Sequence, residues 1–303
     1  MIYVLSLNPS IDYHMDVDDI ILGETNRSKK ETMKIGGKGI NVSYVLDQLG
    51  TPSTLVGFLG GDTGSFIRRH LNNIPRVQNK MIEVDSQTRI NVKFKGHVET
   101  EINGKGAPVN ETAVLALESF FNDIKENDMV IITGRIADGM AKDWYQKLAQ
   151  IVKDKKAQLV VDIATQELIS LCAYNPVLIK PNIAELESIF EVSISDEKEL
   201  VHYAQKLIDL GAQNCIVSLG SKGSMLVNGT HIYKANVPKG KLVNSVGAGD
   251  SMVAGFVHEY LNSKDIKKAY QLAAASGSAT AYSENLAEKE TIEKLKNEIE
   301  IGA

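Results

Sequence analysis

Short runs of apolar residues, each bounded by turn residues, recur along the chain. Uninterrupted runs of this length are typical of strands that are buried on both faces. The runs lie at 3–7, 54–59, 129–133, 159–163, 177–179 and 215–219. Amphipathic patterns between them predict helices, two of which end at Gly50 and Gly211. This alternation predicts an α/β fold, with a mainly parallel sheet covered by helices and a ligand crevice at the carboxyl ends of the strands.

Two segments, 11–34 and 88–102, break this pattern. They alternate polar with apolar residues, as in Arg89-Ile90-Asn91-Val92-Lys93-Phe94, which predicts exposed antiparallel strands. We expect these strands to form a small sheet that acts as a lid over the crevice. A sheet with one apolar face and no helix of its own is marginally stable, so we also expect it to pack against another subunit.

Composition narrows the class of protein. The 303 residues are 43% hydrophobic and 23% charged, with a net charge of −5 and no long basic run, which argues against non-specific nucleic-acid binding. Cys172 and Cys215 are the only cysteines, so neither a disulfide framework nor a four-thiolate zinc site is available. No apolar run approaches the roughly 18 residues of a membrane helix. We expect a cytoplasmic protein that binds neither nucleic acid nor membrane.

The most informative motif is Gly247-Ala248-Gly249-Asp250-Ser251, which is followed by a helical pattern. Two glycines and a helix N-terminus direct backbone N–H groups and partial positive charge at one point, which favours a phosphate-like anion. Asp250 beside that anion indicates a base for phosphoryl transfer to a hydroxyl. At an ordinary pKa of about 3.9 it is already ionised at neutral pH. The alternative is a helix N-cap behind a glycine turn.

A second glycine-rich motif, Gly36-Gly37-Lys38-Gly39-Ile40-Asn41, opens the helix predicted at 40–49. Its glycines allow a ligand to approach the backbone, Lys38 supplies a cation, and Asn41 can bond to hydroxyl groups, so sugar recognition fits. The alternative is a turn with a solvated lysine. Neither a Walker A motif nor Gly-x-Gly-x-x-Gly occurs, which disfavours dinucleotide binding.

The motif Lys180-Pro181-Asn182-Ile183-Ala184-Glu185 ends a strand and begins a helix. An amide at Asn182 and a carboxylate at Glu185, without thiols or histidines, suit Mg²⁺. The alternative is a capping box with Asn in place of Ser or Thr.

A third small loop leaves the strand predicted at 215–219 and could let backbone groups approach a nucleotide. Its residues are Ser218, Leu219, Gly220, Ser221, Lys222 and Gly223. By itself the loop is equally an ordinary hairpin.

Charged residues on the small-sheet segments are further candidates for substrate contacts. Arg27 and Arg89 could grip a phosphate with their planar guanidinium groups, although a lone arginine on an exposed strand is as often solvated. Asp12 follows the first strand, where a carboxylate can accept hydrogen bonds from sugar hydroxyls. The alternative for Asp12 is a turn aspartate.

Taken in order, four of these motifs resemble those of the ribokinase-like sugar kinases, in the phosphofructokinase B branch. They are Asn8-Pro9-Ser10-Ile11-Asp12 and the motifs that begin at Gly36, Lys180 and Gly247. Each is moderately specific alone, but together they span nearly the whole chain.

The resemblance implies one kinase domain over residues 1–303, with a Rossmann-like α/β core and a β lid that often forms a dimer interface. It also implies ATP, Mg²⁺ and a sugar substrate. Asp250 matches the family's general base, and the amides of Gly247, Ala248 and Gly249 match its anion hole. Asn182 and Glu185 match the Mg²⁺ motif with Lys180 before them, and residues 218–223 match a nucleotide loop. The matches to sugar-binding positions are Asp12, Gly36, Gly37, Lys38 and Asn41.

Within the family, Arg27 and Thr88-Arg89-Ile90-Asn91 are similar to the residues found in members whose substrate already carries a phosphate. Thr100-Glu101-Ile102-Asn103 and the Asn8-Pro9 opening look most similar to those of members that phosphorylate fructose 1-phosphate at the C6 hydroxyl with ATP. Kinases of tagatose 6-phosphate or fructose 6-phosphate are alternatives, as are a nucleoside kinase and a non-catalytic sugar-phosphate sensor. Many relatives read Gly-Ser-Leu-Pro where this chain has Gly134-Arg135-Ile136-Ala137. Arg135 therefore either adds a phosphate ligand or belongs to a reshaped loop.

Overall fold

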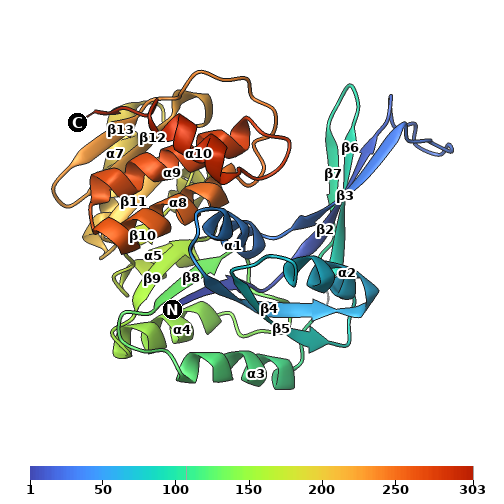
Figure 1. Ribbon diagram of the computed structural model, residues 1–303, viewed down its shortest axis with the longest axis horizontal. Coiled ribbons are helices and arrows are strands. Elements are labelled where there is room, and N and C mark those ends of the chain that lie inside the picture. Colours follow the sequence, from blue (N-terminus) through green and yellow to red (C-terminus); the bar gives the residue numbers. More distant parts are fainter. Residues whose placement is uncertain (107, 303) are drawn as a thin grey trace.

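A ten-stranded sheet crosses the molecule in the computed structural model, which describes residues 1–106 and 108–302 (Figure 1). In spatial order its strands are β14 (Ile301–Gly302), β13 (Ile232–Ala235), β12 (Ser224–Asn228), β11 (Asn214–Ser218), β10 (Leu178–Ile179), β9 (Gln158–Asp162), β8 (Met129–Thr133), β1 (Ile2–Ser6), β4 (Ser53–Gly60) and β5 (Val77–Val84). The strands from β11 through β5 in this order run parallel to one another, and β12, β13 and β14 add an antiparallel edge.

The predicted mainly parallel sheet is confirmed. Each of the six apolar runs overlaps a strand, and every residue of β1, β4 and β8 is buried, as expected for strands with helices on both faces. Strand β5 gives no such run in the sequence, because it lies at the sheet edge and only Val77 and Met81 among its residues are buried.

Helices cover both faces of the sheet, with one apolar core beneath each layer. One layer consists of α1 (Lys38–Gln48), α2 (Gly61–Leu71), α8 (Ala248–Ser263), α9 (Ile266–Ala281) and α10 (Lys289–Lys296). The other consists of α3 (Glu111–Asn122), α4 (Trp144–Asp154), α5 (Glu167–Cys172), α6 (Ile183–Phe190) and α7 (Glu197–Asp209). Among the residues that the structure describes, no helix is long and apolar enough to span a bilayer.

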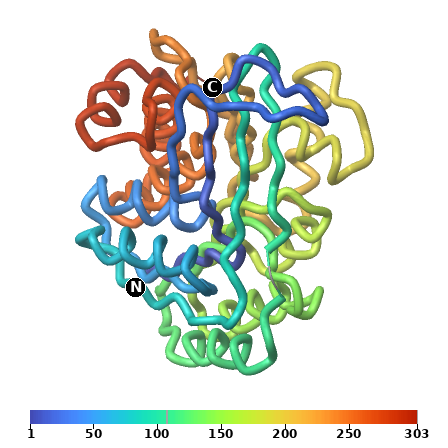
Figure 2. The backbone as a smooth tube through the Cα atoms, turned by 90° about the vertical axis from the view of Figure 1, so that its right-hand side faces the viewer, coloured from blue at the N-terminus to red at the C-terminus, as the bar shows by residue number. Residues whose placement is uncertain are grey.

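A second, four-stranded sheet, called the small sheet below, stands beside the main body (Figure 1). Its order is β3 (Lys30–Gly36), β2 (Ser10–Asp16), β6 (Arg89–Lys95) and β7 (Thr100–Asn103). Figure 2 faces its two hairpins, which lie side by side.

The expectation of purely antiparallel strands is wrong at one pair, because β2 and β6 run parallel. Strand β2 follows β1 and strand β6 follows β5, and both β1 and β5 are parallel to β4. The two strands therefore leave the same edge of the main sheet in the same direction.

Register divides the small sheet into a polar and an apolar face. Asp12 lies opposite Asn91, and since directly paired residues share a face, both belong to the polar one. On the other face, Ile90, Met33 and Ile102 are 44%, 45% and 62% exposed. An apolar sheet face with this much exposure is a candidate contact surface.

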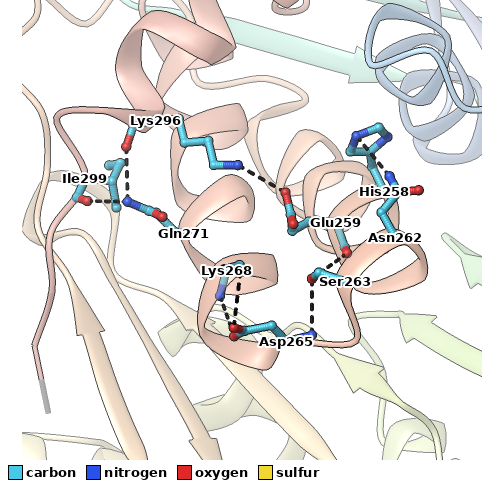
Figure 3. Close-up of polar contacts among 9 residues, drawn as sticks. All are labelled: His258, Glu259, Asn262, Ser263, Asp265, Lys268, Gln271, Lys296 and Ile299. Carbon is cyan, nitrogen blue, oxygen red and sulfur yellow. Dashed lines mark hydrogen bonds and ion pairs between the residues drawn. The ribbon is translucent and has the colours of Figure 1, made fainter.

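The carboxyl-terminal end of helix α8 is fixed by a group of polar contacts (Figure 3). Glu259 accepts from the Lys296 ammonium at 3.1 Å, and Asp265 caps helix α9 by accepting from the Lys268 backbone N–H at 3.0 Å. Gln271 donates to the carbonyl groups of Lys296 and Ile299. These contacts hold α8, α9 and α10 together at the end of α8 that is remote from Asp250.

Candidate active site

A cavity of about 1230 Å³ lies between the small sheet and the N-termini of helices α1, α6 and α8. It brings together side chains from all four sequence motifs that carry the resemblance. Among those that line it are Asp12, Lys38, Asn182 and Asp250. The expected crevice at the carboxyl ends of the parallel strands is therefore present, and residues from the sequence motifs line it.

Gly247 is the N-cap of helix α8 and has a φ of 81°, which favours glycine. A Cβ atom there would also lie 2.5 Å from Leu286 Cδ2. The N–H of Ala248 donates to the Ser245 carbonyl at 3.2 Å, whereas those of Gly247 and Gly249 have no partner among the described residues. Two of the three predicted amide donors are thus unpaired at a helix N-terminus, where partial positive charge favours an anion.

Asp250 lies in the first turn of α8 and is 6% exposed. Its Oδ2 accepts a hydrogen bond of 2.7 Å from Asn41 Nδ2, on helix α1. Burial and, to a lesser extent, the Asp162 carboxylate raise the pKa of Asp250 to about 6, against the effects of Lys38, Lys180 and the Asn41 hydrogen bond. The expectation of an ordinary aspartate pKa is therefore wrong, because the sequence motif does not reveal how deeply the side chain is buried.

Asp162 is a site residue that the motifs missed. It ends strand β9, is 1% exposed, and its two oxygens lie 3.2 Å from the ammonium groups of Lys38 and Lys180. Burial alone would raise the pKa of Asp162, but the two lysines lower it. Its position at the carboxyl end of a buried strand is the only sequence signal that could have indicated it.

Lys180 connects this ion-paired cluster to the glycine motif of α8. Its side chain is 5% exposed, and a Cβ atom on Gly249 would lie 2.8 Å from its Nζ. Because the ammonium lies against the first turn of the helix, it adds a full positive charge beside the free amide of Gly249.

On the small-sheet side, Asp12 lines the cavity. One of its oxygens accepts from Ser10 Oγ at 2.8 Å and from Asn91 Nδ2 at 2.7 Å. A Cβ atom on Gly36 would lie 2.7 Å from both Asp12 oxygens, so the glycine lets the two strands approach. Asp12 is thus a fixed acceptor at the cavity wall.

Arg89 also lines the cavity, and backbone and amide acceptors hold its guanidinium. Nε donates to the Asn8 carbonyl and Nη1 to Asn91 Oδ1 and the Gly104 carbonyl, each at 3.1 Å. Among the described residues no carboxylate lies within ion-pair distance of Arg89, and its Nη2 has no hydrogen-bond partner. Burial lowers the pKa of Arg89, as does the nearby Arg135, while Asp12 raises it. Such a positioned cation suits an anionic ligand.

Two predicted cations lie elsewhere. Arg27 is exposed in the connection between β2 and β3, not on a strand, and Arg135 is exposed in the loop after β8. Neither lines the cavity. Periodicity could not separate them from Arg89, because it does not reveal how far each side chain lies from the crevice.

Asn182 and Glu185 form the capping box that the sequence offered as the alternative, and both also line the cavity. Asn182 Oδ1 accepts from the Glu185 N–H at 2.8 Å, and Glu185 Oε2 accepts from the Asn182 N–H at 2.9 Å. Within the described ranges no three His, Cys, Asp or Glu side chains form a metal-binding group. Glu185 Oε1 has no hydrogen-bond donor among the described residues, and Mg²⁺ commonly takes only one or two protein carboxylates and keeps its waters, so these residues fit that ion.

The loop at 218–223 is a hairpin, which is one of the two possibilities that the sequence allowed, and part of it also lines the cavity. It joins the antiparallel strands β11 and β12 as a hairpin, with a short 3₁₀ helix at Gly220–Lys222. Ser218, Gly220, Ser221 and Gly223 line the cavity, whereas Leu219 and Lys222 do not.

The remaining walls come from segments that carry no motif. They include Tyr44 on α1, Gly277 on α9, and the loops 236–246 and 282–286. Tyr282 Oη donates to the Pro238 carbonyl at 2.6 Å, which joins these two loops. Sequence reasoning missed them because their position depends on the packing of α8 against α9.

Comparison with known proteins gives concordant results. The model of the pfkB family carbohydrate kinase matches residues 3–292. The chain is 41% identical to the 1-phosphofructokinase of Bacillus subtilis (strain 168) and 32% identical to the D-tagatose-1-phosphate kinase of Bacillus licheniformis, each time over 99% of both chains. It superposes on the crystal structure of phosphofructokinase-2 from Escherichia coli in complex with fructose-6-phosphate with a TM-score of 0.89, at 25% identity and 98% coverage of both chains.

Proposed function

The chain belongs to the pfkB family of carbohydrate kinases, and from this premise we propose that it transfers the terminal phosphoryl group of ATP to the C6 hydroxyl of fructose 1-phosphate. The product is fructose 1,6-bisphosphate. The observation that supports the reaction most is that Asp250 shares one cavity with Asp12, Arg89 and two helix N-terminal amides that have no partner among the described residues.

Asp250 acts as the general base. Its carboxylate accepts the proton of the C6 hydroxyl as the bond to phosphorus forms, and the bond between the phosphorus and the leaving oxygen of ADP breaks. A base with a pKa of about 6 is largely ionised at neutral pH and closer to the optimum for proton transfer than an ordinary aspartate.

The amides of Gly247 and Gly249, with Lys180 beside them, stabilise the negative charge of the transferring group. Ala248 contributes to the shape of this turn, because its own N–H is already bonded to Ser245. The Asp162 carboxylate holds Lys180 and Lys38 in fixed positions on either side of it.

The sugar phosphate binds on the small-sheet side. Asp12 accepts hydrogen bonds from sugar hydroxyls, Gly36 and Gly37 allow close approach, and Lys38 and Asn41 complete the wall. Arg89 binds the C1 phosphate, and Arg135 adds positive charge near it.

The nucleotide binds against the loop at 218–223, where Ser218, Gly220, Ser221 and Gly223 supply backbone and hydroxyl contacts. Asn182 and Glu185 would hold Mg²⁺, an ion that commonly takes one or two protein carboxylates and keeps its waters. When bound, the ion neutralises charge on the phosphate oxygens.

We propose that two copies of the chain associate through the apolar face of the small sheet. The 44–62% exposure of Ile90, Met33 and Ile102 supports this, as does Leu22, which lies in the connection between β2 and β3 and is 92% exposed. In such a dimer Arg27, which lies outside the cavity of its own chain, would be available to the partner's site. The small sheet would also close over the cavity and exclude water. Sedimentation of the wild-type protein and of an Ile102→Asp variant tests the association. We expect a dimer for the wild type and a monomer for the variant, and a monomeric wild-type protein would refute the proposal.

The choice of sugar phosphate follows from the relatives. Identity to the 1-phosphofructokinase is 41%, against 32% to the D-tagatose-1-phosphate kinase. The test is an ADP-release assay with Mg-ATP and a panel of fructose 1-phosphate, fructose 6-phosphate, tagatose 6-phosphate and unphosphorylated fructose. We expect the highest kcat/KM for fructose 1-phosphate. A clear preference for another acceptor would refute the substrate, and no turnover with any of them would refute the kinase role.

A further inference from the structure

Two buried hydroxyl groups join the glycine turn of α8 to the segment 284–287 beside the cavity. Thr280, on α9, is 1% exposed, and Ser251, directly after Asp250, is fully buried. Their oxygens lie 2.7 Å apart. Thr280 Oγ1 accepts from the Ala287 N–H at 3.0 Å, and Ser251 Oγ donates to the Gly247 carbonyl at 2.8 Å.

The direction of these hydrogen bonds follows from the outer donor, the Ala287 N–H, and the outer acceptor, the Gly247 carbonyl. Ser251 has one hydroxyl proton, which it donates to Gly247, so the proton between the hydroxyls belongs to Thr280. A continuous series of hydrogen bonds therefore runs from the Ala287 N–H through Thr280 and Ser251 to the Gly247 carbonyl. Every donor in it has an acceptor, and a fully satisfied buried network of this kind fixes the groups that it joins.

Both ends of this series of hydrogen bonds lie beside the cavity. Gly247 is the N-cap that presents the free amides, and Leu286, directly before Ala287, packs against it. Residues 284–286 line the cavity, and the backbone N–H groups of Val243 and Asn244 donate to the Ala281 carbonyl. The end of α9 is thus bonded to both loops beside the glycine turn.

Ser276 shows that a buried hydroxyl on this helix does not need such a partner. It lies one turn before Thr280, is fully buried, and its Oγ has no hydrogen-bond partner in the described part of the chain. Serine and threonine within helices usually bond back to the carbonyl four residues earlier, as Ser251 does. Thr280 makes tertiary hydrogen bonds instead.

We propose that Thr280 and Ser251 are positioning residues for phosphoryl transfer. They hold the Gly247–Ala248 peptide against the wall at 284–287, so that the amides of Gly247 and Gly249 stay directed at the transferring group. This rests on the proposed function, because the amides matter only if a phosphoryl group is transferred there.

The test compares Thr280→Val, which keeps the shape and removes the hydroxyl, with Thr280→Ser, which keeps the hydroxyl. Complete loss of one backbone amide that stabilises the transition state costs about 10²–10³ in turnover. Thr280→Val should only misalign the amides of Gly247 and Gly249, so we expect it to lower kcat about 10-fold. KM for the sugar phosphate should change less than about twofold, because the sugar wall is untouched. Thr280→Ser should retain most of the wild-type kcat.

Ser276→Ala is the matched control, since it removes a buried hydroxyl from the same helix without breaking a hydrogen bond. It should leave kcat unchanged. If Thr280→Val lowers only the melting temperature, or if Thr280→Ser loses as much kcat as Thr280→Val, the proposal is wrong. Should Thr280→Val not fold, Ser251→Ala breaks the same series of hydrogen bonds and is expected to lower kcat similarly, and a wild-type kcat in that variant would overturn the proposal.

Wild-type protein assayed in parallel separates the two hypotheses. Absence of turnover with fructose 1-phosphate refutes the proposed substrate. The ratio of the Thr280→Val and Thr280→Ser rates, measured with whichever sugar phosphate the wild type accepts, tests the positioning role.

Discussion

Replacing Asn41 with alanine should move the pH dependence of the reaction toward higher pH. Asn41 Nδ2 donates to Asp250 Oδ2 at 2.7 Å, and this hydrogen bond favours the ionised carboxylate. A hydrogen bond to a charged group contributes about 1.5–3 kcal/mol, which corresponds to about 1–2 pKa units. The pKa of Asp250 should therefore rise from about 6 to about 7–8 in the variant.

The effect on rate follows from the ionised fraction of the base. Near pH 7 that fraction is about nine-tenths for a pKa of about 6, and between a half and a tenth for a pKa of about 7–8. We expect kcat to fall about 2- to 10-fold at neutral pH and to recover at about pH 9. The assay is kcat measured from about pH 5 to about pH 9 at saturating substrates, in which kcat reports the ionisations of the bound complex.

Asn91→Ala is the matched control. Asn91 also donates to a carboxylate of the cavity at 2.7 Å, but to Asp12 instead of Asp250. That variant should raise KM for the sugar phosphate and leave the acid limb of the kcat profile where it is in the wild type. An unshifted acid limb in Asn41→Ala, or an equal shift in Asn91→Ala, would refute the assignment of the limb to Asp250.

Three further substitutions test neighbouring parts of the site. Asp162→Asn should move the acid limb to lower pH, opposite to Asn41→Ala, because it removes a repulsive carboxylate and leaves Lys38 and Lys180 unpaired beside Asp250; a shift upward would contradict this electrostatic account. Gly249→Ala should lower kcat by at least about 10-fold, since the new methyl group would lie 2.8 Å from Lys180 Nζ, and a wild-type kcat would show that neither the turn nor the lysine is constrained. Arg89→Ala should raise KM about 10- to 100-fold for fructose 1-phosphate and much less for unphosphorylated fructose, and an equal effect on both sugars would exclude a phosphate contact.

Much of the fold could be predicted from the sequence because buried parallel strands leave uninterrupted apolar runs. The strands β1, β4, β8 and β9 were found in this way. The edge strand β5 gives no such run, because only Val77 and Met81 among its residues are buried. The parallel pairing of β2 with β6 depends on where each strand leaves the main sheet, which alternation within a segment does not encode.

The candidate site likewise contains residues that local sequence predicts and residues that depend on distant contacts. Asp250, Asn182 and Asp12 lie in motifs where glycine, proline or a strand end marks an abrupt change of backbone direction, and all three line the cavity. Asp162 and Thr280 lie within ordinary strand and helix patterns, and their roles depend on partners far away in the sequence. Lys38 lies 124 residues from Asp162, and Ser251 lies 29 residues from Thr280. The raised pKa of Asp250 likewise results from burial by distant segments.

The most direct test of the central claim is kcat of Asp250→Asn together with its affinity for ATP. An asparagine keeps the shape of the side chain but cannot accept the hydroxyl proton. We expect kcat to fall by about 10²–10⁴-fold while the dissociation constant for ATP changes little. A kcat close to that of the wild-type protein would show that Asp250 is not the base.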